Sequence, residues 1–156
     1  MLQPKSRNWP DKMSQFLYPQ HLQQLKDALE GPLPGIQAQL RMVGRVRAMP
    51  ARVTENCKQS AVLCLLFPDE GQLSVLLMKR KDDNTAHSGQ VSFPGGKFEP
   101  ADPDYCATAI REAREEVGIN PEKIEILGAL TPLYIPVSNF NVHPFVGCTL
   151  KLLTGI

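Results

Sequence analysis

The clearest apolar pattern in the first third of the chain is helical. Within residues 19–30 leucines recur three and four positions apart, Pro19 stands at the first helical position, and Gly31 follows the last one. This spacing predicts a short amphipathic helix that covers one side of a domain. Residues 36–42 are expected to add one or two helical turns. The apolar side of the first helix would consist of Leu22, Leu25 and Leu29.

A second pattern begins near residue 60, where apolar positions become continuous. The run over residues 61–67 is typical of a strand that is buried on both faces. The Pro-Asp-Glu-Gly sequence at 68–71 predicts a turn, and residues 74–79 predict a second strand. These two strands are expected to pair as an antiparallel hairpin.

Further strands are expected late in the chain, within residues 124–130 and 140–153. Pro136 and Pro144 fall in this region. Because proline has no amide hydrogen to donate to a central ladder, both are expected at strand ends or edges.

A long polar segment and a second helix lie between these strands. Residues 80–102 are rich in glycine and proline, and loops of such length in compact domains are usually functional or disordered. The helix is predicted over residues 103–117. Asp102 is its expected N-cap, Pro103 its first residue, and Gly118 its terminating residue.

Composition and charge indicate one ordinary globular domain. The chain has 156 residues, of which 42% are hydrophobic and 21% charged, and its formal net charge is +1. Nothing in this balance indicates nucleic-acid binding. The N-terminal residues lack the apolar core of a secretory signal, and no apolar run approaches the roughly 20 residues that span a bilayer. A cytoplasmic protein without membrane contact is therefore expected.

The four cysteines show no metal-binding spacing. None is paired as C-x-x-C, so a zinc site is not expected. Mostly apolar neighbours favour buried free thiols over a catalytic cysteine. The cysteines are Cys57, Cys64, Cys106 and Cys148.

Candidate chemistry is concentrated on the second predicted helix. At about 100° per residue, Glu112, Glu115 and Glu116 fall on one arc of its surface. Carboxylates at this spacing repel one another, and a hard divalent cation such as Mg²⁺ or Mn²⁺ would offset that repulsion. A different arc is suited to packing on a sheet. It consists of Cys106, Ile110, Ala113 and Val117.

The acidic arc also has a simpler interpretation, in which it is a solvated surface whose glutamates form ion pairs with Arg111 and Arg114. The acidic pattern taken alone favours this interpretation. The preceding segment changes that balance. It contains Gly95 and Gly96, where backbone without side chains can closely approach a metal ion or a phosphate. A glycine-rich backbone, an acidic helix and a terminating glycine together indicate a metal or phosphate site more specifically than any one of these features does alone.

These residues resemble the signature of the Nudix family, G-x5-E-x7-R-E-U-x-E-E-x-G-U, where U is aliphatic. Asp102 stands at the first glutamate position, and one additional residue precedes Arg111. The matching residues are Gly96, then Asp102 after five residues, and, after eight more, Arg111-Glu112-Ala113-x-Glu115-Glu116-x-Gly118-Ile119.

The resemblance implies an α/β fold, an α/β/α sandwich around a mixed sheet. Residues 1–58 would form a helical N-terminal extension, and residues 59–156 the Nudix domain. The late C-terminal helix of the family has little room before Ile156, so a truncated C-terminus is expected. An uncovered sheet face would favour a homodimer.

The resemblance also implies roles for the site residues. Glu112, Glu115 and Glu116 would ligate Mg²⁺ or Mn²⁺, with the carbonyl of Gly96 as a further ligand. Arg111 would orient a glutamate, and the choice of catalytic base stays open. Metal ions would neutralise the charge of a pyrophosphate, polarise a phosphoryl oxygen and activate water.

The segment before the helix is similar to the pattern of coenzyme A pyrophosphatases, L-L-T-x-R-[SA]-x3-R-x3-G-x3-F-P-G-G. The chain has the same spacing but departs from the pattern at Met78, Lys81 and Thr85. The resemblance implies cleavage of coenzyme A or acyl-coenzyme A to 3′,5′-ADP and 4′-phosphopantetheine. Substrate-binding residues would be Arg80, Gly89, Phe93, Pro94 and Gly95. The identical residues are these five with Leu76, Leu77 and Gly96.

Two other functions stay open, namely an ADP-ribose or dinucleotide pyrophosphatase and a non-catalytic nucleotide-binding domain. In each case the partner is a small molecule linked through a nucleoside diphosphate. Aromatic residues could frame a base-stacking pocket, although a core position is favoured. These are Tyr134, Phe140 and Phe145. His87 is interpreted as structural, and His21 and His143 belong to no pattern.

Overall fold

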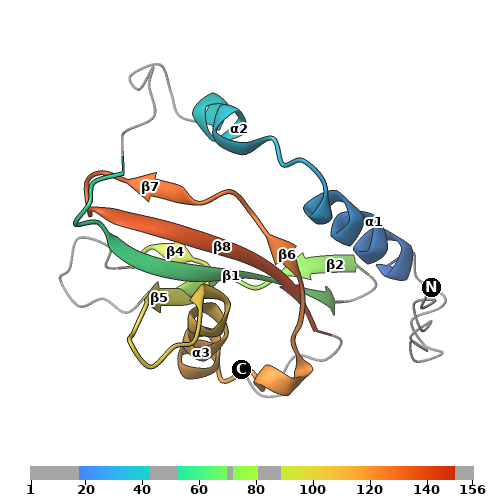
Figure 1. Ribbon diagram of the computed structural model, residues 1–156. Coiled ribbons are helices and arrows are strands. Elements are labelled where there is room, and N and C mark those ends of the chain that lie inside the picture. The colour runs from blue at the N-terminus through green and yellow to red at the C-terminus, as the bar shows by residue number, and fades with distance from the viewer. Residues whose placement is uncertain (1–17, 43–52, 70–71, 81–88, 150–156) are drawn as a thin grey trace.

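A mixed β-sheet with helices on both faces forms the centre of the computed structural model, which describes residues 18–42, 53–69, 72–80 and 89–149 (Figure 1). The main sheet has the strand order β2-β1-β8-β6, with β5 paired to β1 and β7 paired to β8. β1 and β8 are parallel, and the other pairs are antiparallel. The strands are β1 (Lys58–Asp69), β2 (Gln72–Val75), β5 (Gly95–Lys97), β6 (Glu125–Ala129), β7 (Leu133–Ile135) and β8 (Phe140–Cys148).

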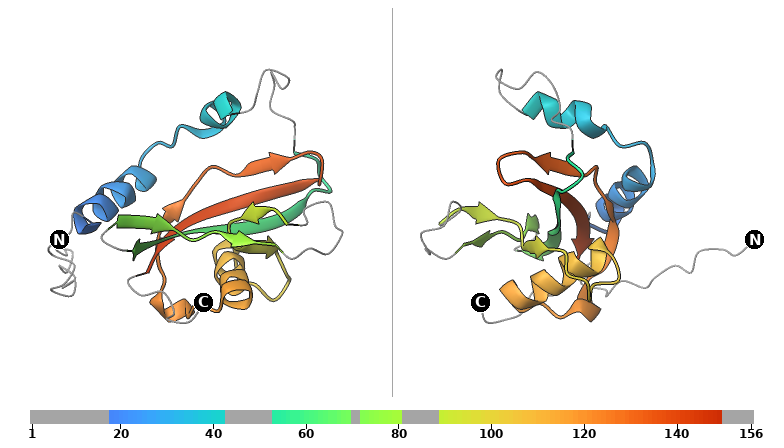
Figure 2. Two further views of the ribbon diagram at one scale, coloured as in Figure 1. Left: turned by 180° about the vertical axis from the view of Figure 1, so that it is seen from behind. Right: turned by 60° about the vertical axis from the view of Figure 1, so that its left-hand side comes forward.

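Helices α1 (Tyr18–Glu30) and α3 (Tyr105–Val117) cover opposite faces of this sheet, as the two views of Figure 2 show. Successive residues of a strand point to opposite faces. Accordingly, Leu63 packs beneath α3 and Leu66 packs beneath α1. The predicted sandwich architecture is thereby confirmed. The remaining helical elements are α2 (Gly35–Met42) and the 3-10 helix η1 (Pro121–Lys123).

The N-terminal helix contributes to the same hydrophobic core as the sheet. Leu22 of α1 is only 5% exposed and packs with Leu127 of β6 and Val146 of β8. At Gly128 an added Cβ would lie 2.7 Å from the Cβ of Leu29, so β6 and α1 approach as closely as a glycine permits. The predicted helix at 19–30 is confirmed, as is the short helix at 36–42. None of the helices in the described ranges is long and apolar enough to span a membrane.

The predicted hairpin is confirmed only in its first half. β2 pairs antiparallel with β1 through Val75, opposite Leu66. The expected strand at 74–79 does not continue along β1 beyond Val75, because Met78 pairs with Ser92 instead. β3 (Met78–Lys79) and β4 (Val91–Ser92) thus form a separate two-stranded sheet. Of the predicted turn at 68–71, the first two residues belong to β1, and residues 70–71 lie outside the described part.

The segment at 80–102 is not the continuous loop that its composition predicts. It contains β4 and β5, and β5 pairs with β1 in the register Val62 to Gly95 and Ala61 to Gly96. An added Cβ on Gly95 would lie 2.7 Å from the Cα of Val62. Glycine therefore permits strand pairing here rather than preventing it. Residues 81–88, including Thr85 and His87, lie outside the described part.

The start of α3 was also predicted incorrectly. Asp104, not Asp102, is the N-cap, since its side chain accepts a hydrogen bond from the amide of Ala107 at 2.8 Å. The helix end is confirmed, because Gly118 adopts φ 68° and its amide donates to Arg114. Such a left-handed cap favours glycine.

Pro144 lies within the central strand β8 and not at a strand end or edge. The carbonyl of Pro144 accepts a hydrogen bond from the amide of Leu130 at 2.9 Å. The nitrogen and carbonyl of one strand residue point to the same side of the strand, so the Pro144 nitrogen also faces the side of Leu130. On that side, β7 pairs with β8 as far as Val142, and β6 pairs from Phe145 onward. Proline is tolerated because the position falls between these two ladders.

Candidate active site

The acidic arc of α3 meets the glycine pair of β5. A methyl group on Gly96 would overlap both carboxylate oxygens of Glu112, so the backbone of β5 and this carboxylate touch directly. The Glu112 side chain is only 15% exposed, whereas that of Glu115 is 57% exposed. Glu112 is therefore more buried than Glu115 and Glu116, although the three glutamates share one arc.

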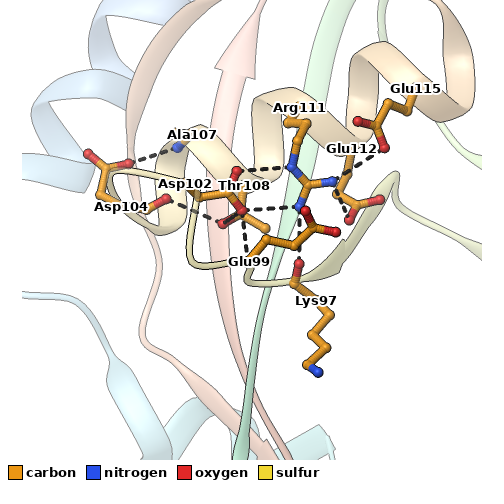
Figure 3. Close-up of polar contacts among 9 residues, drawn as sticks. All are labelled: Lys97, Glu99, Asp102, Asp104, Ala107, Thr108, Arg111, Glu112 and Glu115. Atoms are coloured by element: carbon orange, nitrogen blue, oxygen red, sulfur yellow. Dashed lines mark hydrogen bonds and ion pairs between the residues drawn. The ribbon is translucent and has the colours of Figure 1, made fainter.

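Arg111 connects this arc to the loop before the helix (Figure 3). A guanidinium has five N–H groups in a rigid planar fork. Its Nη1 donates to Glu112 at 2.9 Å and to Glu115 at 3.3 Å. Its Nε and Nη2 donate to Asp102 at 2.9 and 3.1 Å, and Nη2 also donates to the carbonyl of Lys97 at 3.1 Å. These five contacts match its donor capacity and fix the positions of both glutamates.

Asp102 accepts hydrogen bonds from two further groups besides Arg111. Its Oδ2 accepts from the amide of Glu99 at 3.0 Å and from the hydroxyl of Thr108 at 2.9 Å. Its side chain is only 6% exposed. The residue that was predicted to cap the helix is thus a buried anchor for Arg111, which the local cap pattern did not reveal.

Glu116 is held by a different contact. Its Oε2 accepts a hydrogen bond from the amide of Gly95 at 2.8 Å. This contact links α3 to β5 a second time, beside the contact of Glu112 with Gly96. The Gly95-Gly96 backbone and the two glutamates consequently form one continuous surface.

The electrostatics of the site follow from this arrangement. Burial raises the pKa of Glu112, and the hydrogen bond and charge of Arg111 oppose that rise. The hydrogen bond from Arg111 holds the pKa of Asp102 well below the usual range of an aspartate, against the opposing effect of burial. The hydrogen bond to Asp102 in turn raises the pKa of Arg111. The hydrogen-bonded ion pair between Asp102 and Arg111 is thus the largest single influence on the pKa of each partner.

The donor set suits a hard cation, although the acids are occupied by protein partners. Within the described ranges, no three acidic, histidine or cysteine side chains gather closely enough to hold an ion. Arg111 pairs with Glu112 and Glu115, as the simpler interpretation of the acidic arc anticipated. The available donors are nevertheless all oxygens, and at Gly96 the carboxylate of Glu112 fills the space of a side chain. Oxygen donors around a backbone that carries no side chains fit Mg²⁺ or Mn²⁺.

The residues expected to bind substrate lie between the end of β3 and the start of β5. Arg80 follows β3, is exposed, and donates its amide to Gln90 at 3.0 Å. Gly89 adopts φ 70°. Phe93 is 38% exposed, whereas Pro94 is fully buried and its carbonyl accepts from Leu63 at 2.9 Å. Of this group, Gly95 is hydrogen-bonded to the acidic helix, through the carboxylate of Glu116.

Sequence comparison identifies the family to which this helix and loop belong. The model of the NUDIX domain family matches residues 58–150. The chain belongs to the Nudix family. The match includes β1, the glycine pair and the whole of α3, so the contacts described above lie inside the Nudix domain.

Relatives of this Nudix domain are themselves named as hydrolases. It is 44% identical over 102 residues to "Uncharacterized Nudix hydrolase NudL" of Enterobacter sp. (strain 638), covering 65% of this chain and 52% of that protein. It is 41% identical over 90 residues to "Nudix hydrolase 22, chloroplastic" of Arabidopsis thaliana, covering 58% of this chain and 30% of that protein. The chain thus spans about half the length of these curated relatives, or less.

Solved structures show the same fold. The Nudix hydrolase RenU from M. smegmatis matches with a TM-score of 0.51 at 19% identity, over 62% of this chain and 63% of that chain. The NUDIX domain of NrtR from Shewanella oneidensis, complexed with ADP ribose, matches with a TM-score of 0.50 at 19% identity, over 74% and 72%. At this identity the likeness concerns architecture alone.

His143, which belonged to no sequence pattern, lies beneath the first turn of α3. Its ring stacks on Tyr105 with centroids 3.8 Å apart, and Nε2 lies 2.9 Å from Oε1 of Gln59. Burial lowers the pKa of His143. Phe145 packs against the core below α3, in agreement with its favoured interpretation. Only the pairing of β1 with β8 brings His143 and Gln59 together.

Proposed function

We propose that this chain is a metal-dependent pyrophosphohydrolase that cleaves the diphosphate linkage of a nucleoside diphosphate derivative. The observation that carries the proposal is the contact between the largely buried carboxylate of Glu112 and the backbone of Gly96. A second link from Glu116 to Gly95 places another carboxylate on the same surface. Membership of the Nudix family supports the same reaction class.

Glu112, Glu115, Glu116 and the Gly96 carbonyl would hold Mg²⁺ or Mn²⁺. When bound, the ion would neutralise diphosphate charge and lower the pKa of a coordinated water. Nη1 of Arg111 donates to both Glu112 and Glu115, which holds these two carboxylates on the same side of α3 before an ion binds. Asp102 would retain Arg111 when either glutamate turned toward an ion, because it holds the opposite edge of the guanidinium.

Coenzyme A or an acyl-coenzyme A is the substrate that the sequence favours. The support is the spacing from Leu76 to Gly96, which is similar to the pattern of coenzyme A pyrophosphatases. Within this segment Arg80 has an exposed side chain that could pair with a substrate phosphate. Cleavage would give 3′,5′-ADP and 4′-phosphopantetheine, or its acylated form.

A substrate panel with Mg²⁺ or Mn²⁺ tests both the reaction and the substrate. The panel contains coenzyme A, acetyl-coenzyme A, NADH, ADP-ribose and nucleoside triphosphates, and mass spectrometry identifies the products. Hydrolysis of the coenzyme A species above the rest is expected. Preferred cleavage of ADP-ribose or NADH would support the pyrophosphohydrolase reaction but contradict coenzyme A as its substrate. Nucleotide binding without turnover would overturn the enzymatic function.

A further inference from the structure

Thr108 is a fully buried hydroxyl residue in the first turn of α3, three residues before Arg111. Its relative exposure is 0%. The Thr108 hydroxyl lies 2.9 Å from Oδ2 of Asp102 and 3.3 Å from the carbonyl of Asp104. Because a hydroxyl has one proton and Asp102 is the nearer and charged acceptor, we assign that proton to Asp102.

The Thr108 hydroxyl and the Arg111 guanidinium both donate hydrogen bonds to the Asp102 carboxylate, from the same face of α3. Residues three apart in a helix are neighbours, so Thr108 and Arg111 both reach Asp102. Oδ2 accepts from Thr108 at 2.9 Å and from Arg111 at 3.1 Å, while Oδ1 accepts from Arg111 at 2.9 Å. Figure 3 shows the carboxylate between these two side chains. Without the hydroxyl, one of the contacts that set the rotation of this carboxylate is lost.

The orientation of Asp102 is transmitted because the guanidinium is planar and rigid. Asp102 holds the edge formed by Nε and Nη2, and Nη1 on the far side donates to Glu112. A rotation of the carboxylate therefore moves the group that fixes Glu112 beside Gly96. The carboxylate, guanidinium and glutamate form a continuous chain that begins at the Thr108 hydroxyl.

We propose that Thr108 is a positioning residue of the metal site, acting through Asp102 and Arg111 to hold Glu112 against Gly96. Outer partners of metal ligands commonly influence affinity in this way. The inference rests on the proposed metal-dependent function and adds a residue that touches neither ion nor substrate.

Mn²⁺ binding to the full chain tests this role without relying on turnover. Free Mn²⁺ is measured by electron paramagnetic resonance for the wild type, Thr108→Val and Thr108→Ser, at a temperature where circular dichroism shows each variant folded. Valine removes the hydroxyl at similar volume, whereas serine retains it. We expect about tenfold weaker binding for Thr108→Val and near wild-type binding for Thr108→Ser.

Thr54→Val is the matched control. The Thr54 hydroxyl donates to Asn139 at 2.9 Å, so this variant also loses a side-chain hydrogen bond, outside α3. It is expected to bind Mn²⁺ as the wild type does. Should Thr108→Val not fold, Thr108→Ala removes the same hydroxyl without adding a methyl group.

The outcomes separate this inference from the proposed function. Wild-type protein that binds no Mn²⁺ would overturn the metal-dependent function and the positioning role together. Mn²⁺ binding by the wild type with equal affinity in folded Thr108→Val, or in folded Thr108→Ala, would overturn the positioning role alone. Equal weakening in Thr54→Val would show a general effect of lost stability and would likewise overturn it.

Discussion

Asp102 and Arg111 meet edge to edge, with Nε 2.9 Å from Oδ1 and Nη2 3.1 Å from Oδ2. The pair joins the loop after β5 to the helix that carries the acidic arc. Since Arg111 has its remaining donors on Glu112, Glu115 and the carbonyl of Lys97, this ion pair connects the loop to two of the three glutamates.

Asp102→Asn is expected to lower thermal stability by several degrees at neutral pH. The native pKa of Asp102 lies below the ordinary aspartate value of 3.8, so the folded state favours the charged form. Its contribution is therefore complete above that ordinary value and is lost as pH falls toward the native pKa. The difference in melting temperature between wild type and variant should be largest at neutral pH and shrink below about pH 4, as measured by circular dichroism.

Asp104→Asn is the matched control for this prediction. Asparagine is as good an N-cap as aspartate, and its side-chain oxygen can still accept from Ala107. Little change in melting temperature is expected. A difference for Asp102→Asn that stays constant from pH 7 down to pH 3 would contradict the ion-pair explanation.

Gly96→Ala is expected to lower turnover by roughly ten- to a hundredfold, because the added methyl would displace the Glu112 carboxylate. Steady-state kinetics with Mg²⁺ on the best substrate of the panel measures the change. Gly31→Ala provides the control, since a methyl there meets its nearest atom, the carbonyl of Ala28, at an ordinary 3.6 Å. Full activity in Gly96→Ala would show that the contact with Glu112 is not needed.

Glu116→Gln is expected to lower turnover by at least about a hundredfold. The amide oxygen of glutamine can still accept from the Gly95 amide, so the link between α3 and β5 would survive. The loss would then report on the missing charge rather than on misfolding. Glu122→Gln, an exposed substitution in η1, should leave turnover unchanged. Comparable rates for Glu116→Gln and wild type would exclude Glu116 as a metal ligand.

Leu22→Ala should reduce the free energy of unfolding by about 2–5 kcal/mol, the usual range for a buried leucine. Leu22 is 5% exposed and packs with Leu66, Leu127 and Val146. Urea denaturation measures the change. Met42→Ala on α2, where the side chain is 88% exposed, should stay within about 0.5 kcal/mol. An equally small effect at Leu22 would mean that α1 is not part of the cooperative core.

Local rules were sufficient to predict that α1 and α2 form, where α3 ends, the first strand and the acidic arc. The leucine spacing of α1, the continuous apolar run of β1 and the glycine end of α3 each depend on neighbours within a few residues. The shared arc of Glu112, Glu115 and Glu116 follows from helical geometry alone. The presence of the acidic helix after a glycine pair was therefore predictable from sequence.

The sequence could not decide which acid caps α3 or where β5 pairs. Asp102 and Asp104 both satisfy the local cap pattern, and only the position of Arg111 in the folded chain commits Asp102 to an ion pair. Gly95 resembles a loop residue until Val62 of β1 lies against it. Pro144 is acceptable in a central strand only because two other strands end and begin beside it. These features depend on contacts between distant segments, and such contacts exist only once burial and hydrogen bonding have brought the segments together.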